Sequence, residues 1–163
     1  MTGAGWASIS LGEVLHQRLP DVKVEPTQQY QFAGVYSFAR GVFRAPERTG
    51  TETSYKVLTR IAAGEFVYPK LMAWEGAFGV VPPECDGCYV SPEFPVFKIE
   101  RRRVLPRWVE FYFKVPAHWQ TISGGSIGTN VRQATPVKRE SALPSSTTAS
   151  LRKLTEELTK SKR

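Results

Sequence analysis

Two sequence patterns and two histidines in this 163-residue chain could in principle do chemistry. Cys85-Asp86-Gly87-Cys88 is a C-x-x-C pair, a spacing used for thiol–disulfide exchange and for metal binding. Gly124-Gly125-Ser126-Ile127-Gly128 matches the G-x-S-x-G pattern that surrounds a nucleophilic serine. The only histidines, His16 and His118, lie far apart in the sequence. Each pattern therefore has to be weighed against an ordinary structural role.

None of these patterns is completed by the partners that its chemistry needs. The two cysteines are the only ones, so a four-thiolate zinc site within one chain is excluded. They follow Pro82-Pro83 in an expected turn rather than opening a helix, where the helix dipole would lower a thiol pKa. No Asp or His follows Ser126, as the hydrolase order requires. We predict structural cysteines, no catalytic residue, no metal site and no cofactor.

Basic residues beside aromatic ones point instead to binding. Arg101-Arg102-Arg103, followed by Arg107, is the densest basic run outside the C-terminal region. Arginine suits phosphates and guanine edges through its bidentate fork, although a solvated turn would explain the run equally well. Basic and aromatic residues are also interleaved further upstream, as on many nucleic-acid surfaces. From charge and loop position we predict DNA contacts by Tyr36, Arg40, Arg44, Tyr68, Lys70, Arg101, Arg102, Arg103 and Arg107.

Short strands separated by breakers must position these residues. The apolar and β-branched patterns predict strands at 30–38, 42–44, 55–61, 66–68, 77–81, 88–91 and 94–99. Helices are predicted at 106–114 and, as a turn, at 117–122, while 8–15 would begin as a strand and become helical. Residues 45–53, which contain Pro46 and Gly50, read as an exposed loop. The pattern predicts an α+β fold: a twisted mixed β-sheet of short strands with flanking helices. Four large aromatics are expected in its core: Trp74, Phe78, Phe94 and Phe97.

The positive charge is concentrated near the C-terminus. Residues 1–129 hold 14 Lys/Arg and 12 Asp/Glu, a net +2, and residues 130–163 hold 8 and 3, a net +5. We predict one folded domain over residues 1–132, followed by a flexible basic tail. This tail, residues 133–163, is a Ser/Thr/Pro-rich linker and then a short basic helix or frayed end. In that last part Leu151, Leu154 and Leu158 share one helical face.

The composition also limits the class of protein. Hydrophobic residues make up 41% of the chain, which excludes wholesale disorder. No apolar run approaches the roughly 20 residues that span a bilayer, so no membrane association is expected. The N-terminus shows no basic and apolar signal pattern, and we expect a cytoplasmic protein.

Several blocks resemble the target recognition domain of type I restriction–modification DNA specificity subunits. They include Ala73-Trp74-Glu75-Gly76-Ala77-Phe78 and Ser91-Pro92-Glu93-Phe94-Pro95-Val96-Phe97, and the segments 34–43, 108–113 and 128–132 fit as well. The similarity covers roughly residues 6–132. After Arg132 the family's second arginine, its proline-rich stretch and the start of its long spacer helix do not follow.

The resemblance implies a non-catalytic protein with a target-recognition-domain fold. Such subunits carry two recognition domains, each of which reads half of a split sequence in double-stranded DNA. Their long helices dock the methyltransferase (modification) subunit, and the complex includes a restriction subunit. S-adenosylmethionine and ATP belong to those partners. A single recognition domain implies a truncated or frame-shifted product or a half-subunit.

Two alternatives remain open at the level of sequence. The chain could be a truncated recognition domain that acts only in protein interaction, without functional DNA reading, or it could be a C-x-x-C redox protein. Whether the chain forms a homodimer is also left open.

Overall fold

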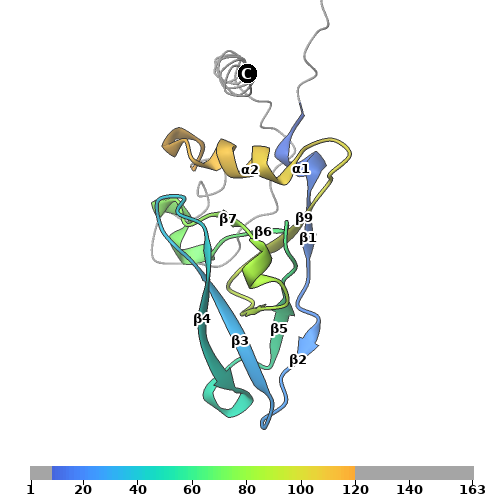
Figure 1. Cartoon of the computed structure of the whole chain (residues 1–163), viewed down its shortest axis with the longest axis vertical. Coiled ribbons are helices and arrows are strands. Elements are labelled where there is room, and N and C mark those ends of the chain that lie inside the picture. The colour runs from blue at the N-terminus through green and yellow to red at the C-terminus, as the bar shows by residue number, and fades with distance from the viewer. Residues whose placement is uncertain (1–8, 120–163) are drawn as a thin grey trace, which may run out of the picture.

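The computed structural model describes residues 9–119 (Figure 1). Short strands and single helical turns alternate along this part of the chain, and one longer helix lies near its end. In chain order the elements are α1 (Leu11–Val14), β1 (Leu15–Arg18), β2 (Val22–Lys23), β3 (Gln29–Val35), β4 (Val42–Thr49), η1 (Gly50–Glu52), β5 (Val57–Arg60), β6 (Phe66–Val67), η2 (Lys70–Glu75), β7 (Gly79–Val80), η3 (Pro83–Cys85), β8 (Tyr89–Val90), β9 (Val96–Ile99), α2 (Pro106–Phe113) and η4 (Pro116–His118).

The strands form two sheets. One has the order β1-β9-β6-β7, and all its pairs are antiparallel. The other has the order β2-β5-β8-β3-β4 and is mixed, because β3 pairs with β8 in parallel. The predicted α+β fold with short strands is confirmed, although the strands divide between two sheets instead of one.

Helix α2 covers an aromatic core. Pro106 occupies its first turn, where the missing N–H has no intrahelical partner to lose. From its far end Phe113 reaches the rings of Phe66 and Phe78, with centroids 4.9 and 4.7 Å apart. Offset stacking of this kind adds about 0.5–1.5 kcal/mol per pair to the burial of apolar area. Phe78 and Phe97 are buried, as predicted.

A second core cluster lies between the two sheets. It contains Val67 and Val96 of the first sheet and Val90 of the second, together with Cys85 and Cys88. Both cysteines are fully covered and unpaired. Phe94 is half-buried against the same cluster.

An ion-pair network also joins the sheets. Arg18 of β1 donates through Nη1 to both carboxylate oxygens of Glu65, each at 2.9 Å, and to the backbone oxygen of Arg60 in β5 at 3.0 Å. Its Nη2 lies 2.6 Å from the Asp21 carboxylate. Glu65 is buried and also accepts the backbone N–H of Ala62 at 2.9 Å. A buried carboxylate needs such partners, because leaving it unpaired is strongly destabilising.

The structure reverses the expected order of elements at 8–15. A helical turn comes first and the strand β1 follows it. The Glu13 carboxylate accepts the Ser10 N–H at 2.8 Å and the Ser10 hydroxyl at 2.9 Å, which fixes the helix start. This is the Ser-x-x-Glu pattern of a capping box, and it was visible in the sequence.

The prediction of a loop at 45–53 is wrong for its first half. Strand β4 continues through Pro46 to Thr49. It is the last strand of its sheet, and an edge strand can carry a proline because one side of its backbone is unpaired. The register with β3 also shifts beside this proline, between Gln31 and Ala33, which marks a β-bulge.

Trp74 was expected in the core and is exposed. Its side chain lies on η2 with 58% of its surface accessible. Ala73 is the residue of η2 that packs inward. None of the helices in residues 9–119 is long and apolar enough to cross a membrane.

Candidate nucleic-acid interface

The hairpin of β3 and β4 is the longest paired element of the described chain, and it carries the candidate interface. It pairs Tyr30 with Arg48 at one end and Val35 with Val42 at the other. Figure 1 shows the hairpin running away from α2 along the length of the molecule. Of the two hairpin strands, β3 is paired on both sides, with β4 and β8, whereas β4 is paired only with β3. The outer edge of β4 therefore has no strand beside it within the described residues. A two-stranded ribbon of this kind fits the width of a DNA major groove.

Two arginines of β4 lie exposed on this hairpin. Arg44 donates through Nη2 to the side-chain oxygen of Gln31, 2.9 Å away on β3. The Gln31 amide nitrogen donates in turn to the backbone oxygens of Phe32, at 3.1 Å, and Ala45. The Arg48 guanidinium lies 6.0 Å from the centre of the Phe32 ring. Guanidinium and amide groups are the side chains that read guanine and adenine edges, so we name Gln31, Arg44 and Arg48 the hairpin residues. Arg44 lies with Gln31 on one face of the hairpin and Arg48 with Phe32 on the other, because side chains alternate along a strand.

The turn at the end of the hairpin brings two predicted residues together. Tyr36 stacks on Phe43 with centroids 4.1 Å apart, and the Arg40 guanidinium lies 5.1 Å from the Tyr36 ring centre. Arg40 Nε also donates to the backbone oxygen of Ser37 at 3.0 Å. Both predicted side chains are exposed. The turn therefore presents a cation and an aromatic ring side by side.

The prediction for Tyr68 is wrong. Its side chain is buried, with 5% of its surface exposed, and packs parallel to Phe97 at 6.0 Å. Burial raises the pKa of its hydroxyl from 10.0 to about 12. Lys70, two residues on, opens η2 with a half-buried side chain, and its N–H donates to Glu93 O at 2.9 Å. Tyr68 is therefore a core residue, and its side chain is not placed on the surface where a DNA contact was predicted.

The arginine run forms a separate surface. Arg101, Arg102 and Arg103 lie exposed in the turn between β9 and α2, and we name this turn the basic loop. Arg101 donates to Ala63 O at 3.2 Å, and Arg103 lies 3.4 Å from the Glu13 carboxylate. These side chains are thus partly held within the protein.

The structure does not bring all the predicted residues to one place. Figure 1 shows the basic loop beside α1, whereas the hairpin turn lies below the other end of α2. Arg107 projects from α2 over Phe111, with its guanidinium 5.3 Å from the ring centre. The candidate interface therefore consists of two basic surfaces, and the hairpin carries the larger set of groups suited to base reading.

The hairpin also carries residues that sequence reasoning missed. Arg48 lay in the segment read as a loop, and Gln31 has no charge to attract notice. Phe38, which is 65% exposed at the turn, belongs to the interleaved basic and aromatic residues but was not predicted as a contact.

The cysteine pair has the environment of a core residue. Burial in apolar surroundings is the main cause that raises the pKa of both thiols, Cys85 and Cys88. Reactive cysteines have the opposite shift. Among residues 9–119, no three His, Cys, Asp or Glu side chains gather where they could hold a metal ion. The Ser126 motif and the leucines at 151–158 lie outside the described residues.

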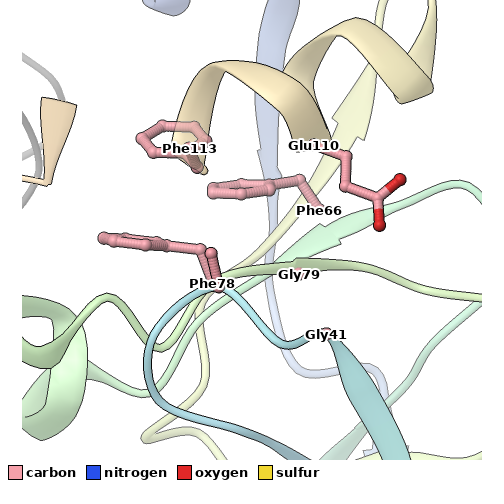
Figure 2. A pocket seen from close by; sticks show the side chains of 7 residues that line it. Gly41, Phe66, Phe78, Gly79, Glu110 and Phe113 are labelled. Carbon is pink, nitrogen blue, oxygen red and sulfur yellow. The ribbon is translucent and has the colours of Figure 1, made fainter. Parts of the chain in front are cut away.

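A small pocket beneath α2 is lined mostly by aromatic rings. Figure 2 shows Phe66, Phe78 and Phe113 stacked on one side of it, with the Glu110 carboxylate pointing away from the rings. The turn glycine Gly41 lies at its other side. The pocket has room for about one water molecule, which is too little for a substrate.

Comparison with known proteins relates this fold to restriction–modification systems. No protein-family model and no curated protein matches the sequence. Solved structures do match the chain in structure, including the following two. One is the HsdS subunit from Thermoanaerobacter tengcongensis, with a TM-score of 0.62 and 18% identity over 82% of this chain. The other, described as showing the structural basis of complex assembly and conformational transition of the type I R-M system, has a TM-score of 0.64 and 19% identity over 98% of this chain.

These matches establish the fold, which this chain shares with part of a type I restriction–modification specificity subunit. The target-recognition-domain-like fold expected from the sequence is thereby confirmed. The chain spans 35% and 44% of the length of the two matched chains.

Proposed function

We propose that the chain is a sequence-specific module of a type I restriction–modification system that binds double-stranded DNA and reads one half of a bipartite target. The observation that carries this proposal is the fold shared with the HsdS subunit over most of the chain. Exposed guanidinium and amide groups on a β-hairpin fit the chemistry of base reading. The proposal includes no catalytic step and no cofactor of the chain's own.

The module would direct partner subunits to the DNA. We propose the methyltransferase (modification) subunit as its first partner and the restriction subunit as a further member of the complex. One of the two matched structures is described in terms of complex assembly. The chain spans less than half of that protein, so a second half-site would be read by another domain or another copy.

Salt dependence of DNA binding tests this proposal. Each phosphate that a protein neutralises releases counterions, so log K falls with log salt concentration at about 0.9 per contact. We expect the full chain to bind random-sequence duplex with a steep loss of affinity between about 50 and 200 mM salt. A double variant, Arg44→Gln with Arg48→Gln, should lower that slope by about two.

A charge-matched control separates contact from net charge. Lys23→Gln with Lys98→Gln removes the same two charges from exposed positions on β2 and β9. If both double variants lower the slope equally, the two hairpin arginines are not DNA contacts. If binding of the wild-type chain stays flat over the salt range, the proposal of a DNA reader is wrong.

A second candidate function is protein interaction without DNA reading. The observation that favours it is an exposed apolar group on η2, where Leu71, Met72 and Trp74 are 55%, 37% and 58% accessible. Such patches often mark protein contacts. If Trp74→Ala abolished binding to a methyltransferase subunit in a chain that binds no DNA, this second function would replace the first.

A further inference from the structure

The turn at the end of the β3–β4 hairpin has a costly backbone. Phe38 and Ala39 both have left-handed dihedrals, with φ of 61° and 51°. A residue with a side chain pays about 1–2 kcal/mol for this conformation. Two in succession are unusual, and such strain persists only where the surroundings enforce it.

Three hydrogen bonds hold the turn in this left-handed conformation. The N–H of Phe38 donates to Glu75 O at 2.8 Å, and the N–H of Ala39 donates to Gly76 O at 2.7 Å. The Ser37 hydroxyl donates to the Glu75 carboxylate at 2.9 Å. The turn is therefore fastened to the end of η2, and its side chains are held by a fixed frame.

The strained turn presents a large apolar side chain to solvent. Phe38 is 65% exposed, although an apolar ring of this size normally gains by burial. One side of its ring faces Trp119, with centroids 6.3 Å apart and planes at 54°. Within residues 9–119 the ring therefore contacts Trp119 and keeps most of its surface exposed.

The same turn carries a cation and a second aromatic ring. Arg40 follows it by two residues and is held against Tyr36 by a cation–π contact. A single supported ring beside a guanidinium resembles the apolar wedges that DNA-binding proteins insert between base pairs. A protein contact would instead use a wider apolar surface than one ring.

We propose that Phe38 inserts between two adjacent base pairs of bound DNA and stacks on an unstacked base, while Arg40 contacts the neighbouring phosphate. This inference rests on the proposed function and adds a mechanism of reading to it. Opening a base step costs least at flexible pyrimidine–purine steps. The wedge would therefore favour half-sites that contain such a step.

The test uses a duplex that the full wild-type chain selects from a random pool. 2-Aminopurine, whose fluorescence rises when it unstacks, replaces each purine of that duplex in turn. We expect a rise at one step with the wild-type chain and none with Phe38→Ala. The affinity of Phe38→Ala should fall about 5- to 150-fold, the range of base–aromatic stacking, with an unchanged salt slope.

Two further variants keep the test specific. Phe38→Trp retains a ring that can stack and should preserve the fluorescence rise. Trp74→Ala removes an equally exposed ring from neighbouring η2 and should behave as wild type. Far-ultraviolet circular dichroism of each variant shows whether the fold is retained, which is expected because an exposed ring is removed.

The outcomes separate the wedge from the function it rests on. If the wild-type chain binds DNA with a steep salt dependence but 2-aminopurine fluorescence rises at no position, the insertion of Phe38 is refuted and the proposal of a DNA-binding module is retained. If Phe38→Ala matches wild type on DNA and instead loses a methyltransferase subunit, the turn is a protein contact. If the wild-type chain selects no duplex, both proposals are overturned.

Discussion

Replacing Tyr68 by phenylalanine tests whether this side chain belongs to the core or to the DNA surface. Tyr68 is enclosed by Phe78 and Phe97, whose ring centroids lie 5.7 and 6.0 Å away. Burial disfavours the charged phenolate and raises the pKa of the hydroxyl to about 12 in the folded chain. In the unfolded chain the ordinary pKa of 10.0 applies.

This difference predicts how stability depends on pH. Below pH 10 the hydroxyl is protonated in both states, so it adds no pH dependence. Between pH 10 and 12 only the unfolded chain releases the proton, and the free energy of unfolding falls as pH rises. The difference between the two pKa values corresponds to about 2.7 kcal/mol in all, of which about 2.3 kcal/mol is lost by pH 12.

Urea unfolding of the wild-type chain and Tyr68→Phe at pH 9 and at pH 12 measures this loss. Other titrating groups are common to both chains and cancel in the difference between them. We expect the wild-type chain to lose about 2–3 kcal/mol more than the variant. A difference that stays constant with pH would refute the argument from burial. At neutral pH the variant should bind DNA as tightly as the wild-type chain. A tenfold weaker affinity would show that the Tyr68 hydroxyl takes part in DNA binding.

Three further predictions concern the framework. Glu65→Gln breaks the pair between the buried Glu65 carboxylate and half-buried Arg18 and should lower the free energy of unfolding by about 3 kcal/mol, measured in urea. Gly76→Ala places a methyl group against the Trp119 indole at a φ of 71° and should cost at least about 1–2 kcal/mol, seen as a lower thermal midpoint. The thiol of Cys85 should react with iodoacetamide slowly in the native chain and rapidly in urea, because it is covered and its pKa is raised.

Matched variants control the first two of these predictions. Arg103→Gln breaks an exposed ion pair at 3.4 Å and should shift the urea midpoint far less than Glu65→Gln, since exposed pairs contribute little. Gly41→Ala also has a positive φ, 98°, but a methyl group there meets no atom within 4 Å. If Gly41→Ala were as destabilising as Gly76→Ala, the clash with the Trp119 indole would not contribute to the loss of stability. Fast alkylation of native Cys85 would contradict its place in the core.

Local sequence patterns determined much of the secondary structure. The helix predicted at 106–114 forms as α2 over Pro106–Phe113, because Pro106 favours a helix start and an apolar face follows it. The strand predicted at 66–68 forms as β6, and that at 94–99 as β9. The missing partners of the cysteine and serine motifs could also be recognised without a structure, since they depend on which residues are present.

The order at 8–15 could be recognised from the local capping box of Ser10 and Glu13, but the length of β4 could not be settled from local preference alone. A proline usually ends a strand. Pro46 is accepted within β4 because β4 lies at a sheet edge. Sheet order is a long-range property, which depends on pairing between segments such as β3 and β8. Local sequence patterns do not show which distant segments pair in a sheet.

The sequence by itself determined that this chain has strands, a helix and basic residues suited to DNA, and its motif blocks indicated the fold that the comparisons support. Only the tertiary structure decided which aromatic side chains face inward. Tyr68 and Trp74 are both large rings with a polar group, so their composition predicts either place. Packing against Phe97 buries Tyr68, while η2 turns Trp74 outward. Burial depends on contacts between distant segments, and these exist only in the folded chain.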